Sequence, residues 1–252
     1  MRDCMCVHRD KDLEVILEKT LDSGGNIWVI GDIHGHFLTL KKLISKLNLG
    51  ENDKIISLGD LIDRGPDSSS VLQLFHDDSM FHFIRGNHED MMINCLRQNK
   101  DNFWESWFRK GGLQTMESFG KRWDEQIEDW CYFLSTSPSE IVLKKYRLIH
   151  AGVNPLKSLD DQNEEDRLWS RDIFKFNSAP DPERQIFIGH TPTQTIEGHR
   201  TPYPWRSEFT TKDNRPAIIN VDTGVCLEKK YQPTLTAVCI NSGQVIQVRR
   251  EH

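Results

Sequence analysis

The sequence predicts an α/β fold built around a largely parallel sheet. Three times in succession, a short apolar segment runs into a polar loop containing glycine, and a segment with helical spacing follows. Strands that alternate with helices in this way form parallel sheets, and side chains at the carboxyl ends of the strands then meet along one edge. All three polar loops stand at those ends. The same pattern that predicts the fold therefore predicts where a functional site lies.

The first unit starts with a helix over residues 10–22, where leucine and isoleucine recur at helical spacing. A strand over residues 26–30 follows, and its run of four apolar residues indicates burial on both faces. This strand ends in Asp32 and His34, with a glycine on either side. Glycine permits a tight bend and leaves room for a close approach. A carboxylate and an imidazole can therefore point to one place here.

The next two units repeat this design. Residues 37–47 form an amphipathic helix with lysines outside its apolar stripe. The strand of residues 54–58 leads into the second loop, and Pro66 stands where the following helix can start. The strand of residues 81–84 leads into the third loop, with a helix after it. The polar side chains of these two loops are Asp60, Asp63, Arg64, Asn87, His88 and Glu89.

The middle of the chain, from about residue 101 to 134, is helical in pattern and rich in tryptophan. We interpret it as a helical segment that buries its aromatic side chains, with a surface for stacking a substrate as the alternative. The acidic run over residues 160–166 is predicted to be a solvated loop. Residues 198–217 contain three prolines among polar residues and are predicted to form a long surface loop.

A second sheet is predicted after residue 139. One of its strands ends at His150 and another at His190. A hairpin that turns at residues 241–243 completes it, because Asn-Ser-Gly separates two apolar runs. The expected strands of this sheet are residues 140–143, 146–149, 185–188, 217–221, 235–240 and 244–248.

Composition limits the class of protein. The chain has 252 residues, of which 37% are hydrophobic and 28% charged, as in a soluble globular protein that can fold as one domain over residues 1–252. A net charge of −6 argues against a surface for nucleic acid. No apolar run approaches the ~18 residues of a membrane span. The amino terminus lacks the apolar core of a signal peptide, so we expect a cytoplasmic location.

The six cysteines are expected to be reduced and mostly buried, as in a cytosolic chain of this length. Cys4 and Cys6, with His8 close by, form the alternative of a soft-metal site. No second pair at zinc-site spacing completes four ligands, so the first interpretation is favoured.

The polar strand ends together form a set typical of a catalytic metal site. Carboxylates, imidazoles and one amide, without a thiolate, suit Mn²⁺, Fe or Zn²⁺ in an open site. One carboxylate can bridge two ions about 3.5–4 Å apart. A single histidine is more often a core or surface residue, but five such strand ends in one chain favour a common site. The residues are Asp32, His34, Asp60, Asn87, His88, His150 and His190.

Seven short blocks carry a family resemblance. The first five resemble, in order, the signature blocks of the phosphoprotein phosphatases, a family of calcineurin-like metallophosphoesterases. The other two blocks, Leu168–Arg171 and Asp222–Gly224, are similar to blocks of bacterial and phage members, a group that includes symmetrical dinucleoside tetraphosphatases. The resemblance runs from about residue 27 to 240 and implies an α/β/β/α sandwich of two mixed sheets flanked by helices. The first five blocks are Gly31–Gly35, Gly59–Gly65, Gly86–Glu89, His150–Gly152 and Gly189–Pro192.

The resemblance implies two divalent metal ions, with Mn²⁺ expected and Fe or Zn²⁺ as alternatives. It makes Arg64 and Arg171 the residues that bind the phosphoryl group, a role that suits a planar guanidinium. It makes His88 the general acid and Asp63 the carboxylate that orients it. The implied ligands are Asp32 and His34 for the first ion, Asp60 as the bridge, and Asn87, His150 and His190 for the second.

Three hypotheses follow for the function. The first is a phosphatase for phosphoserine and phosphothreonine in proteins, with phosphotyrosine as a further candidate, in which hydroxide held by two ions attacks phosphorus in line. The second is a symmetrical dinucleoside tetraphosphate hydrolase, and the third is a catalytically silent binding module. Residues 198–217 and 226–230 have no counterpart that we can assign in the eukaryotic protein phosphatases, and both could shape substrate entry. The blocks do not encode the oligomeric state.

Overall fold

The computed structural model describes residues 6–251, and its first half repeats strand, loop and helix as predicted. After α1 (Lys11–Asp22), three strands alternate with three helices. Helix α3 begins at Ser68, after its N-cap Asp67, which is two residues later than the position of Pro66 had indicated. The elements are β1 (Ile27–Ile30), α2 (Phe37–Ile44), β2 (Lys54–Ser57), α3 (Ser68–Asp77), β3 (Phe81–Phe83) and α4 (Asn87–Gln98).

The first sheet has the strand order β10-β9-β1-β2-β3. Its strands β1, β2 and β3 are parallel, whereas β9 (Thr234–Cys239) runs antiparallel to both β1 and β10 (Val245–Arg249). The hairpin was predicted to complete the second sheet, and that prediction was wrong. Every residue of β9 is buried, and Val238 lies opposite Val29 of β1. The edge of β1 that does not pair with β2 is thereby hydrogen-bonded to β9 inside the core.

The second sheet has the strand order β4-β5-β6-β8-β7. Its three central strands are parallel, and the strand at each edge is antiparallel to its neighbour. The edge strand β7 lies inside the segment 198–217, which therefore is not irregular throughout. The strands are β4 (Glu140–Val142), β5 (Tyr146–Ile149), β6 (Gln185–Ile188), β7 (Trp205–Arg206) and β8 (Ile218–Asn220).

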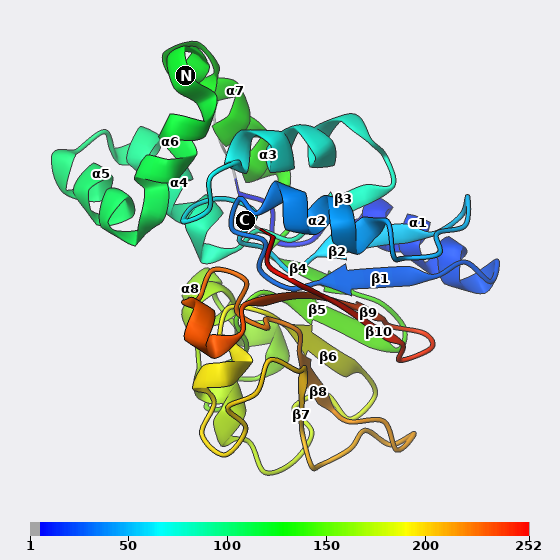
Figure 1. Cartoon of the computed structure of the whole chain (residues 1–252). Coiled ribbons are helices and arrows are strands. Elements are labelled where there is room, and N and C mark those ends of the chain that lie inside the picture. Colours follow the sequence, from blue (N-terminus) through cyan, green and yellow to red (C-terminus); the bar gives the residue numbers. More distant parts are fainter. Residues whose placement is uncertain (1–5, 252) are drawn as a thin grey trace.

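The two sheets pack face to face, one above the other in Figure 1, which gives the predicted sandwich. Residues at alternate positions of the strands, such as Val29 and Ile56 from the first sheet and Leu148 and Phe187 from the second, form the core between them. The other face of the first sheet packs under helices. The outer face of the second sheet is covered mainly by short turns, and Trp205 of β7 packs there with the neighbouring Phe209. Because β1, β2 and β3 are parallel, as are β5, β6 and β8, the polar loops at their carboxyl ends lie along one edge of each sheet, and these two edges meet.

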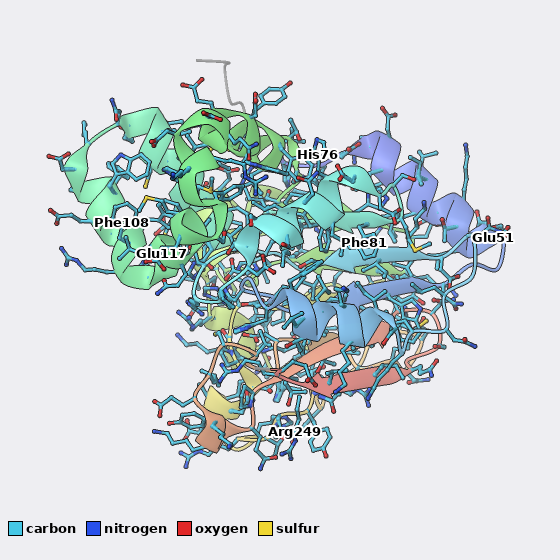
Figure 2. The ribbon with its side chains drawn as sticks, turned by 45° about the horizontal axis from the view of Figure 1, so that its top comes forward. Glu51, His76, Phe81, Phe108, Glu117 and Arg249 are labelled. Atoms are coloured by element: carbon cyan, nitrogen blue, oxygen red, sulfur yellow. The ribbon has the colours of Figure 1, made fainter. Side chains whose placement is uncertain are left out.

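A helical insertion occupies the tryptophan-rich middle of the chain and lies at the left of Figure 1. Trp107 is fully buried and stacks on Trp123 with ring centroids 5.8 Å apart, so the interpretation of buried aromatics holds for these two. Phe108 and Glu117 mark the insertion in Figure 2. Its elements are α5 (Asp101–Trp107), the kinked turn η1 (Phe108–Gly112), α6 (Leu113–Phe119), the 3₁₀ turn η2 (Gly120–Arg122) and α7 (Trp123–Thr136).

The acidic run was predicted to be a solvated loop, and this prediction was wrong. It contains η3 (Leu159–Asp161) and the start of α8 (Glu164–Trp169). Asp166 is buried and accepts a hydrogen bond from the backbone N–H of Asn163 at 2.9 Å, while the Asn163 side chain accepts one from the N–H of Asp166. This is a capping box, which fixes the start of a helix by satisfying its free N–H groups.

The cysteines mostly follow the expectation. Cys95, Cys131 and Cys239 are buried, whereas Cys6 and Cys226 are half-buried. Cys4, the other half of the possible soft-metal pair, lies outside the described residues. No helix within residues 6–251 combines the length and the apolarity that crossing a bilayer would require.

Candidate metal centre

The polar strand ends of both sheets converge as predicted. His34 Nε2 lies 3.8 Å from Asp32 Oδ2 and 3.7 Å from Asp60 Oδ2, which joins the loops after β1 and β2. His150, after β5, places its Nε2 3.4 Å from Asp60 Oδ1. His190, after β6, stacks edge-on against His150 with centroids 5.1 Å apart. All of these side chains are buried, so the two sheets share one site.

Two overlapping groups of metal-ligating side chains stand at this place. One consists of His34, Asp60 and His88, and the other of Asp60, His150 and His190. Within each group the ligand atoms lie within 4.8 Å of one another. Asp60 belongs to both, which is the position expected of a bridging carboxylate. The histidine and aspartate groups are thus consistent with a dinuclear metal site.

Asn87, the first residue of α4, lies within the second group. Its Oδ1 is 2.9 Å from His190 Nδ1 and 2.9 Å from His150 Nε2. His150 Nδ1 donates to the carbonyl of Leu58 at 2.7 Å, so its Nε2 carries the lone pair that faces this amide oxygen. A cation between the two acceptors would satisfy both. His34 is oriented in the same way, since its Nδ1 donates to a backbone carbonyl at 2.9 Å.

The backbone around the site adopts uncommon conformations. Glycine is also required beside it: a Cβ at Gly189 would lie 2.4 Å from Asp32 Oδ1, and one at Gly86 would lie 2.3 Å from Asp60 Oδ1. Left-handed conformations of residues other than glycine cost energy and cluster at functional sites, where the surrounding structure enforces them. The site residues with positive φ are His34, Asp60, Asp63, Arg64 and His190.

The site collects buried carboxylates. Burial raises the pKa of Asp32 well above its usual range, and the charges of Asp222 and Asp60 raise it further. Burial likewise raises the pKa of Asp60, with Glu89 as the next cause. The pKa of Asp222 is raised by burial to about 6. Ionised carboxylates that lie so close together and are shielded from water are stable only when positive charge compensates them.

The residues present fit a pair of divalent cations. His190 donates from Nδ1 to Asn87, so its Nε2 holds a lone pair, and that buried atom has no hydrogen-bond partner within the described residues. Burial lowers the pKa of His150 to about 3 and that of His190 as well, which keeps both imidazoles neutral, as metal ligation requires. Neutral imidazoles, carboxylates and an amide oxygen are hard or borderline ligands.

Beside the metal-ligating groups lies a hydrogen-bonded pair, His88 and Asp63. His88 Nδ1 donates to Asp63 Oδ2 at 2.6 Å, as predicted. Asp63 also accepts from Trp107 Nε1 at 2.8 Å and from Thr115 Oγ1 at 2.6 Å. Burial raises the pKa of Asp63 to about 7, while these two donors lower it. The helical insertion therefore holds the carboxylate that orients His88, a role that the sequence did not indicate for Trp107 or Thr115.

The two predicted arginines take different positions. Arg64 donates from Nη1 to His34 Nε2 and from Nη2 to His88 Nε2, each at 2.8 Å, and it approaches Cys226 Sγ at 3.3 Å. Arg171 is exposed and has no hydrogen bond to these groups within the described chain. The positive charge of Arg171 still acts on the site. Burial is the main cause that lowers the pKa of His150, and the charge of Arg171 is one of the lesser causes.

Glu89 is a site residue whose role the sequence did not show. It is fully buried and accepts backbone N–H groups from Gly86 at 2.8 Å, Asp60 at 2.9 Å and Leu61 at 2.8 Å. One carboxylate thereby ties the loop after β2 to the start of α4. It thereby positions the backbone at Asp60 and Leu61.

Comparison with known proteins places these features in a family. A model of the calcineurin-like phosphoesterase family matches residues 25–220. Serine/threonine-protein phosphatase 1 of Salmonella typhimurium is 38% identical over 90 residues, 34% of this chain and 41% of its own length. Serine/threonine-protein phosphatase 2 of the same species is 32% identical over 155 residues, 58% of this chain and 68% of that protein. The chain thus spans less than half of the first of these relatives.

Two further similar proteins are named for the hydrolysis of dinucleoside tetraphosphates. The symmetrical bis(5'-nucleosyl)-tetraphosphatase of Shewanella baltica is 33% identical over 153 residues, 57% of this chain and 50% of that protein. A crystal structure provisionally assigned as a diadenosine tetraphosphatase superposes with a TM-score of 0.63 at 19% identity, covering 98% of this chain and 99% of its own. At that identity the superposition shows the fold alone.

Proposed function

We propose that this protein removes phosphate from phosphoserine and phosphothreonine residues of proteins. The proposal starts from two findings: the chain belongs to the calcineurin-like phosphoesterase family, and it is a metallophosphoesterase enzyme. The observation that carries the proposal is the convergence of the two metal-ligating groups with the His88–Asp63 pair and Arg64 at one buried edge. A silent binding module is the hypothesis that this convergence disfavours. The specific substrate and the roles of the individual residues are our proposal.

We propose that two divalent ions, with Mn²⁺ expected, are held by side chains from both sheets. Bound ions of this kind lower the pKa of water toward neutrality and neutralise phosphoryl oxygens. The protein's contribution is to fix the ligands, since backbone carbonyls orient the imidazoles and Glu89 anchors the loop of Asp60. The ligands would be Asp32 and His34 for one ion, Asp60 for both, and Asn87, His150 and His190 for the other.

Arg64 and Arg171 would bind the phosphoryl oxygens. To do so, Arg64 must release the two imidazole nitrogens that it now contacts. His88 Nε2 would then be able to carry a proton and donate it to the departing oxygen of the ester, as a general acid does. Asp63 accepts from the other ring nitrogen, so it holds the ring in place and stabilises the cation formed when Nε2 is protonated.

The segment 198–217 supports a monoester substrate over a polyphosphate. It could hold the outer phosphates of a tetraphosphate only if its cations faced the site. Lys212 instead pairs with Glu183, and Arg215 pairs with Asp213 at 2.9 Å. Trp205, in the edge strand β7, packs in the apolar cluster on the outer face of the second sheet. Two of the four cations of this segment are thus engaged with carboxylates of the protein itself, and Arg200 and Arg206 remain.

The substrate is tested by assaying the metal-loaded enzyme on a phosphoserine peptide and on a dinucleoside tetraphosphate side by side. We expect a higher kcat/KM for the peptide. Replacing the two uncommitted loop cations together, Arg200→Gln with Arg206→Gln, should change peptide turnover by no more than about twofold, as is usual for exposed side chains away from a site.

The symmetrical tetraphosphatase is the second candidate, favoured by the relative from Shewanella baltica. It would replace our proposal if kcat/KM for the tetraphosphate were far above that for the peptide and if the double variant strongly raised KM for the tetraphosphate. Activity on neither compound, with metal bound, would contradict both.

The support of Asp63 gives a further prediction. Trp107→Phe removes the indole donor while keeping the ring in the core, and we expect kcat to fall about 10- to 100-fold, since a hydrogen bond to a charged group is worth about 1.5–3 kcal/mol. The effect should vanish in a His88→Asn background, because the indole acts through the His88–Asp63 pair. An undiminished loss in that background, measured by steady-state kinetics, would show that Trp107 acts by another route.

A further inference from the structure

A kink in the helical insertion, at Gly111, contacts the backbone of Arg64 directly. Gly111 has φ 112°, and its carbonyl accepts the backbone N–H of Arg64 at 3.1 Å. A Cβ at Gly111 would lie 2.6 Å from that nitrogen. A left-handed glycine interrupts the helix here, at a kink between α5 and α6. The kink therefore fixes the backbone next to Lys110 relative to the backbone of Arg64, whose guanidinium would bind phosphate.

The residue before Gly111 is Lys110, whose side chain reaches the other half of the molecule. Its Nζ lies 4.5 Å from the ring centroid of Trp169 at the end of α8. Trp169 in turn stands edge-on to His190, with centroids 6.2 Å apart. The insertion and α8 lie on the same side of the molecule in Figure 1. Lys110 thus connects the insertion with the rim of the metal-ligating groups.

This ammonium group is available to a substrate. Lys110 is exposed, and within residues 6–251 no carboxylate forms an ion pair with it. The cation stands between Trp169 and the turn that contacts the backbone of Arg64, so it lies at the rim of the site and not among the metal-ligating groups.

We propose that Lys110 is a specificity-determining residue that binds an acidic side chain next to the phosphorylated residue of the substrate, with the ring of Trp169 holding its ammonium group in place. The inference rests on the proposed function and deepens it. A primary ammonium is a compact charge on a flexible stem, which suits a carboxylate whose position varies between peptides. A tryptophan face holds the cation without neutralising it. Peptides with acidic residues beside the phosphoserine would then be preferred.

The test compares two phosphoserine peptides that differ only in glutamate or glutamine on both sides of the phosphoserine. For the wild-type enzyme we expect kcat/KM to favour the glutamate peptide by about two- to fivefold, the range of one partly solvated ion pair. The preference should reside in KM and should shrink at high ionic strength. Lys110→Met should abolish it and Lys110→Arg should retain it.

Lys110→Glu gives the sharpest outcome, because it should turn the preference toward a peptide with lysine at the flanking positions. Lys121→Met, on the same insertion but without contact to the site, is the matched control and should leave the preference as in the wild type. The inference is overturned if the wild type does not distinguish the peptides, or if Lys110→Met and Lys110→Glu keep its preference. If the wild type cleaves the dinucleoside tetraphosphate and neither peptide, the proposed function itself is wrong.

Discussion

Asp60→Asn is expected to leave the protein folded and to remove most of its metal and activity. Asp60 is the residue common to both metal-ligating groups, and a neutral amide cannot offset the repulsion between two cations. Loss of an outer-shell partner at a metal site costs about 10- to 100-fold in affinity or activity, so loss of the bridging ligand should exceed about 100-fold. Elemental analysis would show fewer than two ions per chain, together with the fall in kcat.

A buried carboxylate outside the site provides the control. Asp53 is buried and accepts the backbone N–H of Asn26 at 2.7 Å, so Asp53→Asn should lower the melting temperature but keep both ions. Asp60→Asn should behave in the opposite way: in a chelator it should melt no lower than the wild type, because one of several crowded buried carboxylates has been removed. Two ions and normal turnover in Asp60→Asn would refute the bridging role.

The part of the fold that could be predicted is the part set by local periodicity. Strand, polar loop and helix recur within about thirty residues of one another, and parallel neighbours then follow from chain direction alone. The pairing of β9 with β1 joins Val238 to Val29, residues at opposite ends of the chain, and no local pattern encodes it. The start of α8 had a local signal, the capping box of Asn163 and Asp166, which the surrounding acidic residues concealed.

The convergence of the site residues could be predicted because each follows a strand and strand ends meet. What could not be predicted is how the site is held. Trp107 and Thr115 come from an insertion whose pattern indicates only buried aromatics, yet they donate to Asp63. The positive φ angle of Arg64 is likewise imposed by tertiary contacts, since an arginine side chain does not favour that conformation.

His88→Asn should separate general acid catalysis from metal binding. His88 belongs to one metal-ligating group by distance, but we assign it as the general acid because Asp63 accepts from its Nδ1 and can stabilise the protonated ring. We therefore expect the variant to retain two ions while kcat falls by roughly 10²- to 10⁴-fold, the usual contribution of general acid catalysis. Loss of one ion instead would make His88 a ligand.

A comparison of two leaving groups tests whether the function lost in His88→Asn is proton donation. Phenolate is a poorer leaving group than p-nitrophenolate and gains more from protonation as the bond to phosphorus breaks. The loss in His88→Asn should therefore be large for phenyl phosphate and much smaller for p-nitrophenyl phosphate. If His88 only positioned Arg64, which donates to it at 2.8 Å, both esters would suffer equally, because each carries the same phosphoryl group. An equal loss would thus assign His88 to phosphate binding and leave the leaving oxygen without an acid from this chain.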